Sequence, residues 1–368
     1  MGNGFYLTLL VGPVVPVPAP KAVLDALTGV QVTTAAGQRS GFQLTLTLAI
    51  GSSLHLLFLP PLLRVVIVVT VGGVPQVISD GVVTHVQAAP SNVPGQSVLT
   101  VTGQDLTAVM DLQDLSGIPY PAMPAEARVA LILAKYLVFG VVPLVLPSIL
   151  IDVPIPTDQI PRQQGTDLAY INSLADDVGY VFYIDPGPAP GANVAYWGPE
   201  IKVGVPQPAL NVNLDSDTNV ESLSFSYDAL SKKLPVIIIQ QQETQIPIPI
   251  PLPDITPLNP PLGALAPALR IEFLDNTAKL TPIQAALIGM AKAAKSADMV
   301  SGSGTLDVVR YGRPLKARSL VGVRGAGQAF DGLYYVQSVT HSIKVGEYKQ
   351  NFTLTRNGVI STVPKVPA

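Results

Sequence analysis

The sequence predicts a protein of the α+β class that is mainly β, with two antiparallel β-rich blocks separated by a helix-containing middle. Apolar and polar residues alternate in segments of residues 1–118 and 219–368, as in strands with one buried face. Segments with helical character interrupt this pattern between residues 119 and 218. A length of 368 residues is sufficient for two or three domains with cores of their own. We expect domains at 1–118, 119–218 and 219–368, with a proline-rich arm at 240–267, and either β-domain can be discontinuous in sequence.

The composition is apolar for a soluble protein. Charged residues make up 13% of the chain, hydrophobic residues make up 48%, and the mean hydropathy is +0.41. The longest apolar stretches, Leu54–Val71 and Val129–Leu150, contain prolines and charged residues, so we expect no membrane span. The apolar surplus suggests surface buried against other chains in an obligate assembly. A Val- and Leu-rich β-core explains the surplus equally well, and composition leaves both possibilities open.

Charge and cysteine content exclude several other classes. The net charge of −3 and the pI near 5.6 lack the basic footprint of a nucleic-acid binder, so we expect no nucleic-acid specificity. Cysteine is absent, which excludes disulfides and thiolate metal ligands. Residues 1–15 have no basic segment before their apolar run and no cleavage signature. We therefore expect synthesis in the cytoplasm without a signal peptide.

The first block contains a succession of short strands. Phe42–Ala49 alternates apolar and polar residues, whereas Arg64–Val71 is a continuous β-branched run suited to burial on both faces. Gly72 and Gly73 end that run, and strands follow at Val74–Ala88 and Gln96–Leu106. Such a series favours a barrel or a sandwich over a parallel sheet.

The middle block predicts two helices and a strand. Glu126–Phe139 follows a proline and is rich in Ala and Leu, which favours a helix. Thr166 is suited to cap a second helix that Gly179 closes. Its apolar stripe consists of Leu168, Ile171, Leu174, Ala175 and Val178. A strand at Tyr180–Asp185 follows.

The third block begins with an unusual proline-rich segment. Ile246–Pro253 has proline at every second position and cannot donate the hydrogen bonds of a central strand, so we expect an extended arm or an edge strand. It can serve as a spacer or lie against a neighbouring subunit, and both readings stay open. A helix is predicted over Thr281–Ala297, which has a cap and a proline at its first position.

The chain then predicts an antiparallel hairpin with one solvated face. Residues expected on the buried face are Leu333, Tyr335, Val339, Ile343 and Val345 on the first strand, and Tyr348, Phe352 and Leu354 on the second. Residues expected on the other face are Ser338, Thr340, Ser342, Lys344, Lys349, Asn351, Thr353 and Thr355. Gly346 permits the tight reversal between the strands.

Searches for catalytic and metal-binding patterns favour structural interpretations. None of the three histidines, His55, His85 and His341, has a partner at metal-ligand spacing. A triad of Ser338 with His341 is disfavoured because alternation places their side chains on opposite faces. Asp176 and Asp177 end a helix, and Asp215 and Asp217 lie in a turn-like cluster without the ligand pattern of a calcium loop. Gly322–Gly327 lacks the features of a phosphate-binding loop and is predicted to connect strands.

One local cluster of positive charge stands out. It consists of Arg310, Arg313, Lys316, Arg318 and Arg324. A solvated face is the ordinary interpretation of such a run, and a docking surface for acidic groups is the alternative.

Motifs that recur in order along the chain carry a resemblance to a known family. They are RYGRPLKAR (Arg310–Arg318), DGLYYVQSVTHSI (Asp331–Ile343), GEYKQNFTLTRNG (Gly346–Gly358), GTDLAYINSLADDVGYVFYIDPG (Gly165–Gly187), AYWGPE (Ala195–Glu200) and NVESLSFSYD (Asn219–Asp228). They resemble the late control protein D type baseplate hub proteins of contractile phage tails and related extracellular contractile injection systems. The resemblance covers most of the chain except 141–161 and 240–267.

This resemblance implies two tail-tube-like antiparallel β-barrels per chain and a homotrimer. Three chains then present six similar barrels to a hexameric inner tube and threefold symmetry to a trimeric spike. It implies a structural, non-enzymatic protein without cofactors, within an assembled phage tail-like particle that contains other baseplate proteins. Unlike spike proteins of the VgrG kind, the sequence ends ten residues after Gly358, so a separate VgrG-like spike is expected. The basic cluster becomes a candidate interface with a neighbouring ring or spike.

Two alternatives belong to other functional classes. A secreted β-rich hydrolase would use His341 with a carboxylate, and a carbohydrate-binding module would use Tyr196 and Trp197 as a sugar platform. A buried role for Trp197, the only tryptophan, is the simpler interpretation.

Overall fold

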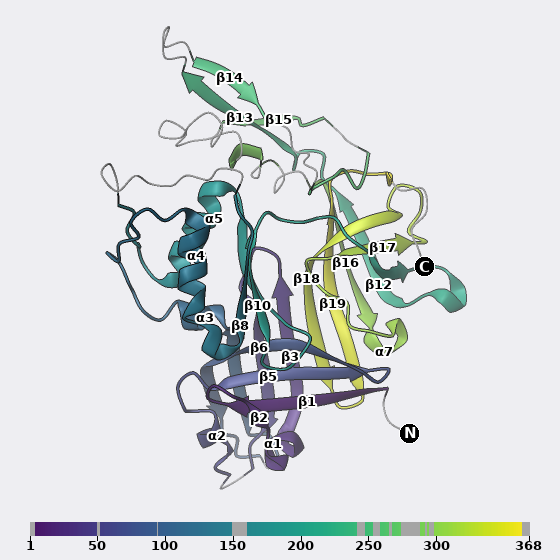
Figure 1. Ribbon diagram of the computed structural model, residues 1–368. Helices are drawn as coiled ribbons and strands as arrows, with labels where there is room; N and C mark the ends of the chain where they lie inside the picture. Colours follow the sequence, from purple (N-terminus) through teal and green to yellow (C-terminus); the bar gives the residue numbers. More distant parts are fainter. Residues whose placement is uncertain are drawn as a thin grey trace.

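The structure consists of one large β-sheet, a helix-containing module beside it and a small separate sheet that projects from one end (Figure 1). This computed structural model describes residues 4–49, 52–93, 95–148, 160–240, 247–252, 258–264, 267–273, 288–290, 293 and 298–362. Within these residues, no helix is both long enough and apolar enough to cross a membrane.

The first block supplies the N-terminal half of the large sheet. Its strands are β1 (Phe5–Gly12), β2 (Val17–Pro18), β3 (Leu27–Ala35), β4 (Gly41–Thr47), β5 (Arg64–Val71), β6 (Val74–Ala89) and β7 (Val98–Asp105). Its short helices are α1 (Lys21–Ala26), α2 (Leu54–Leu57) and α3 (Thr107–Met110). The four strands predicted in this block are confirmed, and β5 is buried along nearly its whole length, as its β-branched sequence requires.

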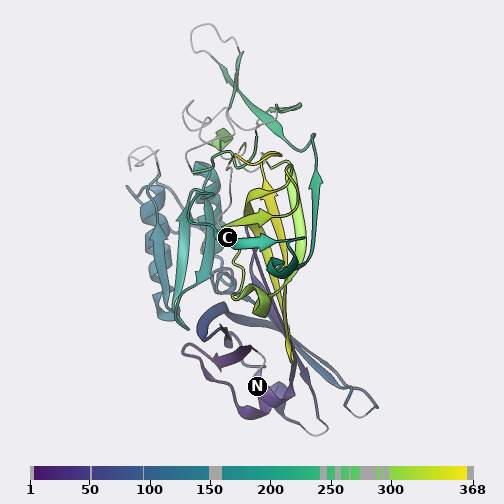
Figure 2. The ribbon, with the colours of Figure 1, turned by 90° about the vertical axis from the view of Figure 1, so that its right-hand side faces the viewer.

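The middle of the chain forms a compact α/β module. It contains α4 (Ala125–Ala134), the 3-10 helix η1 (Leu137–Phe139), β8 (Val141–Val145), α5 (Asp167–Val178), β9 (Val181–Pro186) and β10 (Asn193–Gly198). The strands form a separate sheet in the order β8-β10-β9. Figure 2 shows this module lying alongside the large sheet.

Both ends of α5 match the predicted capping residues, whereas the preceding helix is shorter than predicted. The Thr166 hydroxyl accepts a hydrogen bond from the Ala169 N–H, and Gly179 ends α5 at a φ of 72°, both as predicted. The helix predicted over 126–139 is shorter, because α4 ends at Ala134 and the single turn of η1 follows before Gly140 adopts a φ of 71°.

The last block supplies the C-terminal half of the large sheet. Its elements are β11 (Gln207–Asn211), the 3-10 turn η2 (Asp215–Asp217), β12 (Val220–Tyr227), β16 (Val300–Asp307), α7 (Val308–Tyr311), β17 (Leu320–Arg324), β18 (Gly332–Lys344) and β19 (Glu347–Arg356). Strands β13 (Lys233–Gln240), β14 (Pro247–Pro251) and β15 (Arg270–Phe273) form the projecting sheet in the order β14-β13-β15. The helix predicted over 281–297 lies outside the described residues apart from 288–290 and 293.

Strand β14 confirms the edge-strand prediction for the proline-rich segment. Among the described strands it pairs with β13 alone, which places it at a sheet edge, where proline is tolerated because its missing N–H is not needed for a second ladder. The remaining residues of the predicted arm at 241–246, 253–257 and 265–266 lie outside the described residues.

The two halves of the large sheet repeat the same strand order. The N-terminal half runs β3-β4-β7-β6-β5-β1, and the C-terminal half runs β12-β16-β19-β18 with β17 and β11 attached in turn to β18. Strands β3, β4, β5, β6 and β7 therefore correspond to β12, β16, β17, β18 and β19. The halves differ in one pairing, since β1 is antiparallel to β5 whereas β11 is parallel to β17. Antiparallel pairing of β3 with β18 joins them into one sheet.

Two bulges of the N-terminal half recur at equivalent places in the C-terminal half, whereas the shift in the β5–β6 pairing has no counterpart between β17 and β18. Thr28 is the extra residue of a bulge where β3 pairs with β4, and Glu221 has that position where β12 pairs with β16. Thr84 is the extra residue where β6 pairs with β7, and Gln337 has that position where β18 pairs with β19. Because a bulge fixes local register, these four residues align the halves residue by residue.

The two bulges give one consistent alignment. Counted from the first bulge, the rows across the sheet are Gly29–Thr45–Thr100 in one half and Ser222–Thr305–Asn351 in the other. Counted from the second bulge, they are His85–Thr102 and Ser338–Thr353. Thr100 lies two positions before Thr102, and Asn351 lies two positions before Thr353, so both bulges imply the same alignment. The halves are therefore equivalent in register as well as in strand order.

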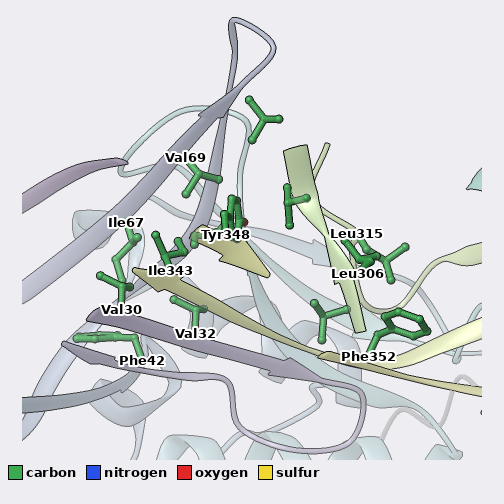
Figure 3. Packing of buried hydrophobic residues seen from close by; sticks show 14 of the residues in the cluster. Val30, Val32, Phe42, Ile67, Val69, Leu306, Leu315, Ile343, Tyr348 and Phe352 are labelled. Atoms are coloured by element: carbon green, nitrogen blue, oxygen red, sulfur yellow. The ribbon is translucent and has the colours of Figure 1, made fainter. Parts of the chain in front are cut away.

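Both halves enclose the same hydrophobic core. Each half folds back over its own long strands, so that β5 faces β3 and β4 across buried side chains (Figures 1 and 3). Ile67, Val30 and Phe42 come from the first half, while Ile343 and Phe352 come from the second. A separate core that includes Trp197 fills the α/β module.

The Gln337 bulge corrects one sequence prediction. Leu333 and Tyr335 were predicted to share a face with Val339 and Ile343, but the extra residue reverses the alternation between them. Tyr334 and Val336 therefore enter the large core, and Leu333 and Tyr335 pack in a small cluster on the opposite face.

The predicted position of Val345 was also wrong. It lies in the two-residue turn of the β18–β19 hairpin beside Gly346, whose φ is 80°, and it is 87% exposed. The rest of the hairpin is confirmed, with Tyr348, Phe352 and Leu354 buried.

Candidate assembly surface

The solvated face of the large sheet carries hydroxyl and amide side chains, with one histidine, across eight neighbouring strands. We call it the hydroxyl face. It comprises Ser222, Ser224 and Ser226 of β12; Ser301, Ser303 and Thr305 of β16; Asn351 and Thr353 of β19; Ser338, Thr340 and Ser342 of β18; Gln31 and Thr33 of β3; Gln43 and Thr45 of β4; Thr100 and Thr102 of β7; and His85 and Gln87 of β6. Each alternates with a residue that points toward the core, as two-residue periodicity requires.

Neighbouring side chains on the hydroxyl face are hydrogen-bonded across the strands. The hydroxyl oxygens of Thr33 and Thr340 lie 3.1 Å apart across the junction between the two halves. Those of Ser338 and Thr353 are 2.6 Å apart on adjacent strands of the C-terminal half. At the border of the face, Lys349 is neutralised by ion pairs with Glu221 and Glu347 at 3.0 and 3.1 Å. The face is suited to exchange hydrogen bonds with water and offers little net charge to a ligand.

The hydroxyl face ends at two strand edges that pair with nothing else in the described chain. Strand β12 pairs with β16 on one side, and its other side is open. Strand β6 pairs with β5 only as far as Val82, so that Thr84–Ala89 has β7 as its single neighbour. Such edges present unpaired backbone N–H and C=O groups and readily accept another strand.

Most of the predicted basic cluster is accessible. Arg310 lies in α7, and Arg313 and Lys316 lie in the loop before β17, where all three are exposed. Arg324 lies at the end of β17 and is half-buried. Their role as an interface stays a prediction.

Arg318 differs from the other basic residues of the cluster because its guanidinium contacts the protein itself. Its guanidinium pairs with Asp185 at 2.5 Å, donates to the Ala35 carbonyl at 2.8 Å and stacks over the Tyr183 ring at 4.3 Å. Burial raises the pKa of Asp185, and the nearby Arg318 opposes that rise. Arg318 therefore ties the α/β module to the large sheet, which sequence spacing alone did not reveal.

The histidines do not form a catalytic or metal site in the described chain. His341 is buried, its Nδ1 lies 2.7 Å from the Tyr348 hydroxyl, and burial lowers its pKa to about 3. Ser338 lies on the other face, as predicted, and bonds to Thr353. His55 lies in α2 and His85 in β6, and no group of three potential metal ligands occurs among the described residues.

The remaining candidate motifs have structural positions. Asp215 and Asp217 form the turn η2, and Asp176 and Asp177 lie on exposed positions near the end of α5. The prediction that Gly322–Gly327 connects strands holds only for its second half, because residues 322–324 are the end of β17 and Gly325–Gly327 begins the loop to β18.

Trp197 cannot serve as a sugar platform, because its side chain is fully buried in the core of the α/β module. Tyr196 is also buried, and its hydroxyl donates to the Pro199 carbonyl at 2.6 Å. Both residues stabilise the β8-β10-β9 sheet, since they lie on its central strand.

A cleft of about 670 Å³ separates the module from the ends of β3 and β17. Its lining includes Arg39, Asp105, Asp176, Tyr183, Arg318 and Tyr335. Burial raises the pKa of Asp105, although hydrogen bonds from Thr107 and Ser40 oppose the rise. Two of its polar lining residues, Arg318 and Asp105, form hydrogen bonds with other groups of the protein.

Comparison with solved structures identifies proteins of the same fold. A tail protein from Neisseria meningitidis MC58 matches with a TM-score of 0.63 at 13% identity over 97% of this chain and 98% of its own. The 43 kDa tail protein of prophage MuSo2 from Shewanella oneidensis matches with a TM-score of 0.65 at 14% identity over 96% and 98%. A chain of the Francisella PdpA–VgrG complex matches with a TM-score of 0.58 at 9% identity over 99% of this chain and 54% of its own.

The chain therefore has the fold of these tail proteins, and the mainly β fold expected from the resemblance is confirmed. No protein-family model and no curated protein sequence matches it.

Proposed function

We propose that this protein is the baseplate hub of a contractile injection apparatus, a homotrimer that adapts a hexameric inner tube to a trimeric spike. The observation that carries the proposal is the duplication of strand order and register within one chain. Three chains around one axis supply six similar rolled sheets to a hexameric neighbour and threefold symmetry to a trimeric one. A ring of this kind needs repeated contacts between identical chains, which suits a chain with few charges.

We assign the two rolled sheets to two tube-like barrel domains. The first corresponds to residues 1–118. The second consists of residues 219–368 together with β11, which precedes them in sequence but pairs with β17. The α/β module between them lies at their side.

The descriptions of proteins with this fold support the choice of neighbours. Those proteins are described as tail proteins and as part of a VgrG complex. We infer a hexameric inner tube protein, a separate VgrG-like spike and other baseplate proteins as partners, within an assembled phage tail-like particle. The role is structural rather than enzymatic.

The projecting sheet favours a contact with a neighbouring component over a spacer. Leu269, Ile271 and Phe273 alternate along the edge strand β15 and its approach, and they are 63%, 63% and 56% exposed. An apolar stripe on an exposed edge is typical of an interaction site.

The mass of the purified chain, measured alone and with its tube and spike proteins, tests the proposed function. We expect a trimer that binds both partners at once. A stable monomer that binds neither would contradict the proposal.

A further inference from the structure

Two strand edges have no partner strand among the described residues, although the equivalent edges in the other half of the sheet pair with each other. The second half of β18, Ser338–Lys344, pairs with β3. The equivalent half of β6, Thr84–Ala89, has no such neighbour among the described residues, and β12, the equivalent of β3, has an open edge. We propose that β12 of one copy pairs antiparallel with the second half of β6 of the next copy. The pairing would repeat between chains the β3–β18 junction within each chain.

The geometry of the long strands supports this pairing. In β18, the first four residues pair with β17, and the strand then passes beyond β17 and accepts β3 on the same side. In β6, pairing with β5 ends at Val82, and the strand continues for seven more residues with that side open. These residues are mostly exposed, and so is β12. Both edges are therefore accessible to a second copy.

The aligned bulges give the register of the proposed junction. Within the chain, Ser338 lies opposite Ala35 and Thr340 lies opposite Thr33. In the register given by the bulges, the equivalents are His85 for Ser338, Gln87 for Thr340, Asp228 for Ala35 and Ser226 for Thr33. The predicted pairs between copies are His85 with Asp228, Val86 with Tyr227, Gln87 with Ser226, Ala88 with Phe225 and Ala89 with Ser224.

The side chains in these pairs are complementary on both faces. On the hydroxyl face, His85 meets the Asp228 carboxylate and Gln87 meets the Ser226 hydroxyl. On the other face, the small Ala88 lies opposite Phe225, which already stacks on Phe330 at 5.2 Å. A slip of one residue would bring the aromatic side chains opposite polar groups, so the register is specified by both faces.

The two edges differ from one another, so copies associate head to tail. Head-to-tail contacts close into a ring when the rotation per copy divides a full turn, and otherwise they grow into filaments. Closure at three copies rests on the proposed function. The hydroxyl face would then be continuous around the ring, with eight strands from each copy.

Engineered cysteine pairs test the junction directly, because the full chain contains no cysteine. Residues directly opposite in an antiparallel pair have Cβ atoms about 4.5–5.5 Å apart, close to the range that a disulfide spans. We expect the double variant Gln87→Cys/Ser226→Cys to form, on mild oxidation, covalent dimers and closed trimers that a reductant dissolves. A mixture of the two single variants should give the covalent dimer.

Two matched variants control for geometry and register. Thr33→Cys/Thr340→Cys has the same geometry within one chain, where the hydroxyl oxygens are 3.1 Å apart, and should close without linking chains. Gln87→Cys/Ser222→Cys is displaced by four residues, about 13 Å along the strand, and should not crosslink.

The outcomes separate the junction from the proposed function. A native trimer whose Gln87–Ser226 pair stays reduced while Thr33–Thr340 closes would overturn the junction and leave the hub intact. Equal crosslinking of the Ser222 variant would overturn the register. Crosslinked rings that contain a number of chains other than three would support the junction and contradict the trimer.

Discussion

Loss of the Asp80 carboxylate is expected to destabilise the contact between the large sheet and the α/β module strongly. Asp80 of β6 receives two hydrogen bonds from Arg64 of β5, both at 2.7 Å, and a third from the Asn193 amide of β10 at 2.9 Å. The Arg64 and Asp80 side chains are 2% and 0% exposed. Arg64 also donates to the carbonyls of Val14 and Gly191, so one buried cluster joins three parts of the fold.

The expected loss of stability can be estimated from the Arg64 charge that the substitution leaves buried and unpaired. Asp80→Ala leaves the Arg64 guanidinium buried without its counter-charge, which destabilises proteins by about 3–5 kcal/mol. A change of 1 kcal/mol shifts Tm by about 2–4 °C in a unit of 150–250 residues. We therefore expect Tm to fall by the order of 10 °C. Replacing both partners, as Arg64→Met/Asp80→Leu, should lower Tm less than Asp80→Ala alone, because no buried charge remains.

Differential scanning calorimetry at neutral pH measures this effect. The matched control is Glu272→Ala, which removes a pair with Lys233 of similar length, 2.8 Å, between side chains that are 43% and 49% exposed. Exposed pairs contribute about 0–1 kcal/mol, so this variant should unfold near the wild-type Tm. If Asp80→Ala unfolds within 2 °C of the Glu272→Ala control, the reasoning about the buried cluster is refuted.

Three further outcomes are expected. Burial lowers the pKa of His341 to about 3 in the fold, against an ordinary value of 6.5, so the unfolded chain binds one more proton between these pH values. The free energy of unfolding should therefore fall as pH drops below 6.5, by up to about 1.4 kcal/mol per pH unit. The variant His341→Gln should reduce this slope in urea unfolding, and equal slopes for the variant and the wild type would contradict the assignment. Thr166→Ala should lower stability by about 1 kcal/mol through loss of the α5 cap, with Thr166→Ser unchanged. Gly103→Ala should lower stability by about 1–3 kcal/mol, because the added Cβ would clash with the buried Phe42 ring. Gly29→Ala is the control, because the space beside Gly29 can hold a Cβ. Equal Tm values for these two variants would refute the packing argument.

Local pattern predicted the strands and the α5 helix well. The β-branched run at Arg64–Val71 is β5, which is buried on both faces. The alternating segment Phe42–Thr47 is most of β4, which is buried on one face. In both strands the residue types follow directly from the burial. Thr166 and Gly179 mark the ends of α5, because capping chemistry is local.

Long-range pairing and bulges were not predictable in the same way. The β3–β18 junction joins residues such as Thr33 and Thr340, more than 300 positions apart, whose types suit many strands. The Gln337 bulge changes the facing of Leu333 and Tyr335 without any signal in the alternation. In its motif, Arg318 resembles the neighbouring basic residues that are expected on the surface. Its ion pair with Asp185 depends on the packing of the α/β module against the large sheet, which the motif does not indicate.

The residue pattern alone does not reveal the duplication, which was expected only from the family resemblance, because equivalent positions differ in residue type. His85 corresponds to Ser338, and Thr28 corresponds to Glu221. Strands β3 and β4 follow one another directly, whereas β13, β14 and β15 separate β12 from β16. What the halves share is the ladder of backbone hydrogen bonds, which many sequences can form.

An end-on projection of the purified assembly by electron microscopy tests the central claim most directly. Two rolled sheets per chain in a threefold ring predict an annular particle with six similar lobes in its wall and true threefold symmetry. A wall with three lobes, or a ring with another number of chains, would contradict the account.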